Sequence, residues 1–121
     1  MANPLCLRGG RILDPARGID RAQDLWIADG RIAGLGEDAP SDVRSHPGAE
    51  MIPVHGAVIC PGLVDLHVHL REPGQEEKET IETGTRAAVR GGFTTVACMP
   101  NTDPPLDDRP RIEYVVRRAA A

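Results

Sequence analysis

The stretch from Asp65 to Arg71 reads DLHVHLR, stands at the end of an apolar run, and decides how the rest of the chain is interpreted. Its alternation of apolar and polar residues is typical of a β-strand, in which successive side chains point to opposite faces. We therefore expect His67 and His69 on one face, together with Asp65 and Arg71. The opposite face would carry the aliphatic side chains of Val64, Leu66, Val68 and Leu70.

Two imidazoles that converge from one strand end can hold one divalent metal ion, and an arginine beside them can hold a carboxylate. A single histidine on a strand is more often solvated or hydrogen-bonded, but the His-x-His spacing satisfies both the geometry and the chemistry of metal ligation. Pro61-Gly62 and Pro73-Gly74 bound the strand. His67 and His69 thus stand at its C-terminal end, where α/β barrels carry their chemistry. The competing interpretation of Arg71 is an ion pair with a nearby glutamate such as Glu72.

The composition narrows the class of protein. The chain has 121 residues, 40% of them hydrophobic, a net charge of −4 and no basic stripe, which argues against nucleic-acid binding. Three cysteines without Cys-x-x-Cys spacing argue for a reducing compartment. The first residues lack the apolar core of a signal peptide, and no run is long enough to span a membrane. These observations predict a cytoplasmic protein.

The first half, residues 1–58, is predicted to be a small β-domain without a catalytic constellation. Short strands are expected over 5–7, 11–13, 24–28, 31–35, 51–54 and 57–60, with an exposed loop over 36–49. Asp29-Gly30 indicates a two-residue hairpin turn. Such a turn would pair Ile27 with Ile32 and Trp26 with Ala33.

The second half, residues 59–121, changes its periodicity. We expect a strand over 63–69, a helix over 76–90, a strand over 93–99, and a second helix capped by Asp107 or Asp108. This order is typical of a parallel sheet covered by helices. A closed (β/α)₈ barrel needs about 250 residues. The predicted fold is therefore α/β: a small N-terminal β-domain, then the first two β/α units of a TIM-type barrel that is truncated.

Glutamates crowd the segment between the first strand and the first helix of this half. We interpret them as a solvated first helical turn, where carboxylates favour the positive end of the helix dipole. They are Glu72, Glu76, Glu77, Glu79 and Glu82.

Five segments carry a family likeness. Residues 61–74, 77–81, 83–88, 91–96 and 99–105 read PGLVDLHVHLREPG, EKETI, TGTRAA, GGFTTV and MPNTDPP. They resemble the amidohydrolase superfamily, and within it the cyclic-amide hydrolases of the type I dihydroorotase family. The first half is similar, more weakly, to the small β-domain that these enzymes build beside the barrel.

The resemblance implies a zinc-dependent hydrolase that interconverts L-dihydroorotate and N-carbamoyl-L-aspartate in pyrimidine biosynthesis. It implies that His67 and His69 bind zinc, and that Arg71 and Asn101 bind the carboxylate of this small-molecule substrate. The remaining metal ligands and the catalytic acid or base of the family fall outside these 121 residues. No catalytic residue is therefore assigned, and the piece alone is expected to bind metal weakly and to be inactive.

Alternatives stay open at this point. One is a different cyclic-amide hydrolase, allantoinase or dihydropyrimidinase, against which Arg71 and the Met-Pro-Asn-Thr loop argue. Another is a non-catalytic dihydroorotase-like subunit that scaffolds aspartate transcarbamoylase. That complex and a homodimer are suggested by analogy alone. Asp65 could orient one of the imidazoles or could cap backbone amides instead.

Overall fold

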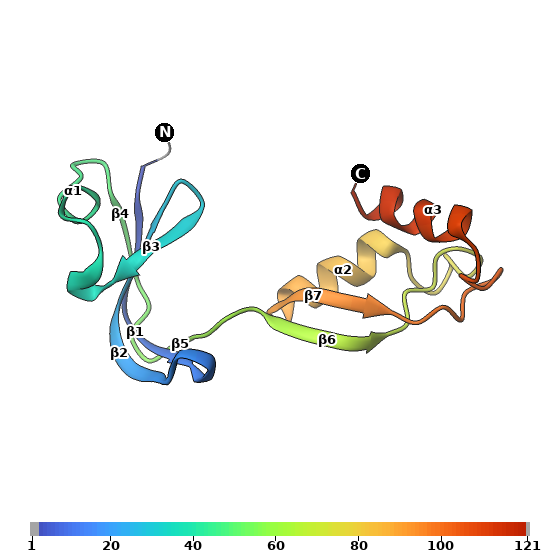
Figure 1. Cartoon of the computed structure of the whole chain (residues 1–121), viewed down its shortest axis with the longest axis horizontal. Coiled ribbons are helices and arrows are strands. Elements are labelled where there is room, and N and C mark those ends of the chain that lie inside the picture. Colours follow the sequence, from blue (N-terminus) through green and yellow to red (C-terminus); the bar gives the residue numbers. More distant parts are fainter. Residues whose placement is uncertain (1–2, 121) are drawn as a thin grey trace. The chain divides into compact units, whose positions relative to one another are not determined.

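The structure, a computed structural model, describes residues 3–120. The chain divides into two compact units, Met1–Pro61 and Gly62–Ala121, and each is described by itself (Figure 1). The first consists mainly of strands, and the second alternates strands with helices. The chain is thus of mixed α/β class. Among the described residues, no helix has the length and apolar character that crossing a bilayer requires.

The first unit is built on one sheet with the strand order β3-β2-β1-β4, and β5 also pairs with β1. Strands β1, β2 and β3 are antiparallel, whereas β4 and β5 run parallel to β1. The strands are β1 (Leu5–Asp14), β2 (Ile19–Ala28), β3 (Arg31–Leu35), β4 (Glu50–Pro53) and β5 (Val58–Ile59). A short 3₁₀ turn, η1 (Pro15–Arg17), joins the first two.

Strand β1 runs without interruption where two strands were predicted, so the expected break at Gly9-Gly10 is wrong. The pairing with β2 shifts register between Leu7 and Gly10, which marks a β-bulge. The carboxylate of Asp24 on β2 accepts a hydrogen bond from the backbone N–H of Gly9 at 2.9 Å. A side chain thus satisfies the amide that the bulge removes from the ladder.

The predicted hairpin at Asp29-Gly30 is confirmed. Both residues have positive φ, 48° and 72°, as the favoured two-residue hairpin turn requires. Ile27 pairs with Ile32 as expected. Trp26, however, pairs with Gly34 and not with Ala33, because the register shifts by one residue on β3.

The core of the first unit forms around Cys6, Trp26 and Ala39, all buried. Ala39 belongs to the segment predicted as an exposed loop. That segment folds into η2 (Gly36–Asp38) and the short helix α1 (Ser41–Arg44), and it closes over one face of the sheet. The prediction of a plain exposed loop is therefore wrong, since the loop supplies part of the core.

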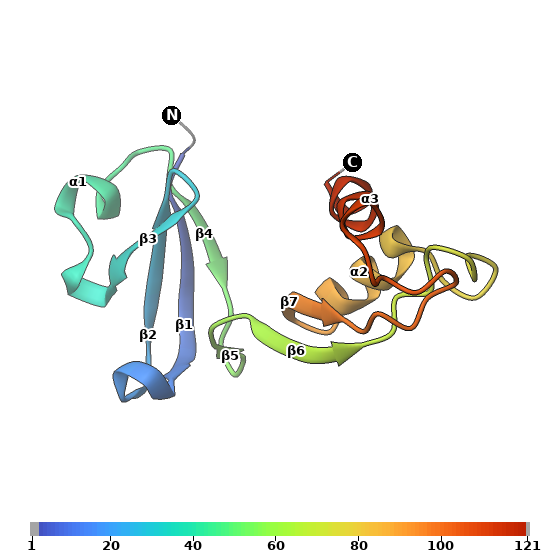
Figure 2. The same cartoon turned by 45° about the vertical axis from the view of Figure 1, so that its right-hand side comes forward.

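The second unit has the predicted order strand, helix, strand, helix. Its elements are β6 (Leu63–Val68), α2 (Ile81–Arg90), β7 (Phe93–Cys98) and α3 (Arg109–Ala119). The two strands are parallel. Figures 1 and 2 both show α2 packed along β7 with α3 beside it, on the same side of the sheet.

Helix α2 begins at Ile81, five residues later than predicted. Thr80 caps it: its hydroxyl accepts a hydrogen bond from the Thr83 backbone N–H at 3.1 Å. In return the Thr83 hydroxyl accepts one from the Thr80 N–H at 2.9 Å, which completes a capping box. Helix α3 is capped by Asp108, one of the two predicted caps, whose carboxylate accepts from the Arg111 N–H at 2.9 Å.

Strand β6 departs from strict alternation. Asp65 pairs with Val96 and Val68 pairs with Cys98, so β6 has one residue more than β7 over this interval. As a result Asp65, Val68 and Leu70 line one cavity of about 270 Å³ between the sheet and α2. Leu66 is 73% exposed on the open side of the sheet. The predicted segregation is therefore wrong: Asp65 faces the helix together with Val68 and Leu70, whereas Leu66 does not.

Candidate functional site

The candidate site lies where β6 and β7 end at the same edge of their sheet. The backbone N–H of Met99 donates to the carbonyl of Val68 at 2.8 Å, which carries the parallel pairing one step beyond the strands. The segment that starts at His69 therefore runs beside the segment that contains Asn101. This is the edge at which open and closed α/β sheets place their ligands.

The two predicted metal ligands lie next to each other. The ring centroids of His67 and His69 are 5.1 Å apart, with an angle of 62° between the ring planes, and both side chains are exposed. Rings this close can each present one nitrogen to a single ion, since zinc–nitrogen bonds are about 2.0–2.1 Å long. Within residues 3–120 no group of three or more His, Cys, Asp or Glu side chains is placed to hold a metal ion.

His69 is also in contact with the second predicted substrate residue. Its Nδ1 lies 3.0 Å from the Oδ1 of Asn101. A carboxamide oxygen is an acceptor, so Nδ1 carries the hydrogen and donates it. The lone pair of His69 is then on Nε2, which is the nitrogen left for a metal. The sequence predicted both residues in the site but not this contact between them.

Arg71 follows His69 by two residues and is half-buried. Its carbonyl accepts a hydrogen bond from the Gln75 N–H at 2.9 Å, so the backbone of the loop is held at this point. Its guanidinium forms no ion pair with any residue from 3 to 120. The alternative interpretation, a pair between Arg71 and Glu72, is therefore not found.

Asp65 caps a backbone amide. Its Oδ1 accepts a hydrogen bond from the His67 N–H at 3.0 Å, across the extra residue of the β6 bulge. Of the two roles considered for Asp65, the structure has the cap and not the contact with an imidazole. The aspartate thus fixes the backbone from which His67 projects.

The two loops at this edge are packed tightly. The N–H of Asp103 donates to the carbonyl of Pro73 at 3.1 Å. Gly74 has a φ of +94°, and a Cβ placed there would overlap the carbonyl oxygen of Asp103. The hydroxyl of Thr102, itself buried, donates to the carbonyl of Pro104 at 2.7 Å. These contacts hold the segments of Arg71 and Asn101 against each other.

Glu72 is a residue whose role the sequence did not reveal. It is only 3% exposed, although it was interpreted as part of a solvated cluster, and for this residue that interpretation is wrong. Glu76, Glu77 and Glu82 are exposed as expected. The only available signal was its place directly after Arg71, and sequence spacing does not distinguish a buried carboxylate from a solvated one.

The comparisons with known proteins identify the family. A model of the dihydro-orotase-like family matches residues 56–121, more than half of the chain and the whole of the candidate site. The chain belongs to this family, as its resemblance predicted.

Similarity to individual curated proteins supports the same family. The chain is 50% identical over 116 residues to a dihydroorotase of Solibacter usitatus and 50% identical over 116 residues to one of Syntrophotalea carbinolica. It is 47% identical to a dihydroorotase of Geobacter sulfurreducens over 117 residues. These matches cover 96–97% of this chain but 26–27% of the relatives. The chain thus spans about a quarter of their length.

Solved structures give the same fold. An L-hydantoinase (dihydropyrimidinase) from Arthrobacter aurescens matches 95% of the chain with a TM-score of 0.77 at 23% identity. A D-hydantoinase (dihydropyrimidinase) from Thermus sp. matches 95% with a TM-score of 0.67 at 28% identity. The chain covers 24% of each of these proteins.

Proposed function

We propose that this chain supplies the first part of a zinc-dependent dihydroorotase, which interconverts L-dihydroorotate and N-carbamoyl-L-aspartate in pyrimidine biosynthesis. The observation that carries the proposal is the juxtaposition of His67 and His69 with Arg71 and Asn101 at one sheet edge. The named relatives, dihydroorotases at 47–50% identity, support the same reaction.

The two imidazoles suit zinc, although they are fewer than the three protein ligands of a catalytic zinc site. Imidazole nitrogen is a ligand that zinc favours, and the contact with Asn101 leaves His69 Nε2 free to bind. Catalytic zinc takes three protein ligands, so His67 and His69 would hold it together with residues elsewhere in the complete protein. Bound zinc would lower the pKa of a water molecule and polarise the ring carbonyl of the substrate.

Arg71 and Asn101 would bind the substrate carboxylate. A guanidinium can donate two parallel hydrogen bonds to a carboxylate, and Arg71 has no ion pair within residues 3–120 that would compete. Asn101 uses its Oδ1 for His69, which leaves its Nδ2 to donate to the same carboxylate. Asn101 would thus contact a metal ligand and the substrate together, and would present the ring amide at the metal.

Hydrolysis adds water across the ring amide: the new carbon–oxygen bond forms at the carbonyl, the carbon–nitrogen bond breaks, and the nitrogen takes up a proton. No side chain from 3 to 120 is assigned to this proton transfer. The acid and base would come from the rest of the complete protein, which is why residues 1–121 alone would bind metal weakly and show no turnover.

We further propose that residues 1–58 are the small β-domain and residues 59–121 the first two β/α units of a (β/α)₈ barrel. The open side of the β6–β7 sheet supports this, because Leu66 is 73% and Val64 55% exposed there. Aliphatic side chains in such a position are the ones that the remaining strands of a barrel would cover.

A second candidate is a hydantoinase or dihydropyrimidinase, which the names of the two structural matches suggest. The ring substrate of that class lacks the carboxylate that Arg71 would bind. A non-catalytic subunit in complex with aspartate transcarbamoylase, and a homodimer, rest on analogy alone. A cytoplasmic location is supported by Cys6, Cys60 and Cys98, which are all unpaired.

The test is an assay of the complete, zinc-loaded protein on L-dihydroorotate, dihydrouracil and allantoin, with its zinc content measured in parallel. Turnover of L-dihydroorotate with zinc bound is the expected result. Zinc-dependent turnover of dihydrouracil or allantoin in its place would establish the rival hydrolases. A complete protein that holds no zinc and shows no turnover would establish the non-catalytic subunit.

A further inference from the structure

The carboxylate of Glu72 joins three segments of the second unit. Its Oε2 accepts a hydrogen bond from the N–H of Ile81, the first residue of α2, at 2.9 Å. Its Oε1 accepts from the hydroxyl of Tyr114 at 2.9 Å and from Nε of Arg118 at 2.8 Å, both on α3. The residue itself stands in the loop after β6, directly after Arg71.

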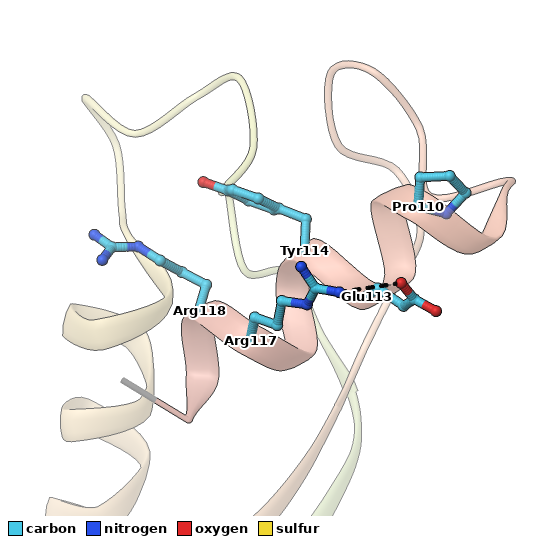
Figure 3. A pocket seen from close by; sticks show the side chains of 5 residues that line it. All are labelled: Pro110, Glu113, Tyr114, Arg117 and Arg118. Carbon is cyan, nitrogen blue, oxygen red and sulfur yellow. Dashed lines mark ion pairs between the residues drawn. The ribbon is translucent and has the colours of Figure 1, made fainter.

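Two different faces of α3 are seen in Figure 3. Tyr114 and Arg118 project together toward the loop that precedes α2, whereas Arg117 pairs with Glu113 away from it. Arg117 is 82% exposed, but the Glu72 side chain that Arg118 contacts is 4% exposed. Helix α3 therefore turns one arginine to solvent and uses the next to reach a buried carboxylate.

A buried carboxylate is costly unless its charge is compensated. Burial alone would raise the pKa of Glu72, but the hydrogen bonds from Ile81, Arg118 and Tyr114 outweigh it and hold the pKa below its ordinary value. The N-terminus of α2 adds the favourable end of a helix dipole. Glu72 is therefore ionised at neutral pH, and hydrogen bonds to an ionised acceptor are the strong kind.

These bonds restrict the backbone next to Arg71. The carboxylate of Glu72 ties residue 72 to both α2 and α3, and residue 71 is joined to it by one peptide bond. Arg71 Nη and Nε atoms have no ion-pair partner within residues 3–120 to orient them. Without such a partner, the start of the Arg71 side chain rests on the backbone of a loop that Glu72 fastens to α2 and α3.

We propose that Glu72 is a positioning residue for Arg71: it fastens the loop after β6 to α2 and α3, and so sets the guanidinium for the carboxylate of the substrate. The proposal rests on the proposed function, because it assigns Glu72 a part in binding that substrate. It makes α3, a helix remote in sequence from the loop, a determinant of substrate affinity.

Glu72→Gln is the direct variant, because glutamine has the same shape without the charge. Its oxygen can satisfy Ile81 N–H, but its NH₂ group then faces the Nε–H of Arg118, which cannot accept, and the Tyr114 hydroxyl has to turn to accept from it. We expect KM for L-dihydroorotate to rise about tenfold, the size of one charge-assisted hydrogen bond, with kcat changed less than about twofold. Zinc content should stay as in the wild type.

A double-mutant cycle of Glu72→Gln and Arg71→Met, measured on the complete, zinc-loaded protein, distinguishes the positioning role from a merely structural one. If Glu72 acts through Arg71, Glu72→Gln raises KM in the wild-type background and has no further effect in the Arg71→Met background. If Glu72 only supports the fold, the two substitutions lower kcat/KM by independent factors, so that their free-energy effects add, and zinc content falls; that result would overturn the proposal.

Arg118→Met keeps the proposal testable should Glu72→Gln fail to fold. This variant removes the hydrogen bond that α3 donates to Glu72 through Arg118. We expect it to raise KM in the wild-type background and to have no further effect in the Arg71→Met background. Arg117→Met is the matched control on the same helix and should leave KM unchanged; equal effects of the two would contradict the proposal. If the wild type does not act on L-dihydroorotate, the proposed function fails with it. An active wild type with an additive cycle refutes the positioning role alone.

Discussion

His69 and Asn101 are 32 residues apart in the sequence, and their side chains meet at 3.0 Å through Nδ1 and Oδ1. The contact joins the loops that follow two adjacent parallel strands. It orients one imidazole and sets its tautomer, while the amide nitrogen of Asn101 stays available as a donor. A proposed metal ligand and a proposed substrate residue therefore form one unit.

Two substitutions of Asn101 separate its two contacts. Asn101→Asp keeps an acceptor for His69 Nδ1 but places a negative charge beside the substrate carboxylate. We expect normal zinc affinity and a KM for L-dihydroorotate raised by about tenfold or more. Asn101→Leu removes both contacts, and zinc affinity should also fall by about 10–100-fold. Steady-state kinetics and competition with a zinc chelator measure the two effects. Identical behaviour of the two variants would refute the double role.

Removal of either imidazole tests the metal site. In the complete protein, His67→Ala or His69→Ala should reduce zinc affinity by more than the roughly 10–100-fold expected for an outer hydrogen-bond partner. His46→Ala is the control, since His46 accepts a hydrogen bond from the Gly48 N–H in the first unit. Metal analysis after dialysis checks the result. Zinc content unchanged in the His67 and His69 variants would show that the metal, if any, binds elsewhere.

The buried carboxylate of Glu72 makes the second unit sensitive to acid. Its pKa is lowered on folding, so it contributes stability above its ordinary pKa of 4.5 and loses that contribution as the pH falls through the folded value. The free energy of unfolding of the wild type should therefore fall more steeply below pH 4.5 than that of Glu72→Gln. Urea denaturation at a series of pH values measures both. Parallel pH profiles would mean that folding does not lower the pKa of Glu72.

Tyr114 gives a prediction for alkaline pH. Its hydrogen bond to Glu72 raises the pKa of the phenol above its ordinary 10.0, because the neutral form is the donor. The stability from this bond is complete below pH 10 and is lost as the pH rises through the folded value. A spectrophotometric titration of this single tyrosine should show a raised midpoint, which Glu72→Gln restores toward 10. A midpoint equal in both proteins would contradict the contact.

The cap of α2 gives a test of local stability. Thr80→Ala removes the hydroxyl that accepts from Thr83 N–H and should reduce the opening free energy of α2 by about 1 kcal/mol. Thr80→Ser retains the oxygen and is the matched control. Native-state hydrogen exchange of the α2 amides measures the change. Equal protection in the alanine and serine variants would show that the capping box contributes nothing.

Local patterns predicted the elements well. Asp29-Gly30 predicted its hairpin because both turn residues must take positive φ, and few residue pairs do so easily. The four elements of the second unit and their order followed from periodicity and caps. The resemblance to the family implied that His69 and Asn101 serve one site, but their direct contact was not predicted.

The predictions that were wrong concern features that depend on tertiary contacts. The bulge in β6 turns Asp65 toward α2, and a bulge depends on how one strand fits its partner, which a single strand's alternation does not reveal. Helix α2 starts at Ile81 because Thr80 and Thr83 cap each other, although residues 76–80 are good helix formers by composition. Glu72 is buried because Arg118, 46 residues away, reaches it. No local pattern contains that partner.

The proposed role of Arg71 in a dihydroorotase is tested by the ratio of kcat/KM for L-dihydroorotate to that for dihydrouracil, measured on the complete, zinc-loaded protein and on its Arg71→Met variant. We expect the wild type to prefer L-dihydroorotate strongly. Arg71→Met should lose about two orders of magnitude in kcat/KM on that substrate alone, because only that substrate carries the carboxylate. A wild type that prefers dihydrouracil, or an Arg71→Met variant with an unchanged ratio, would contradict the proposed role.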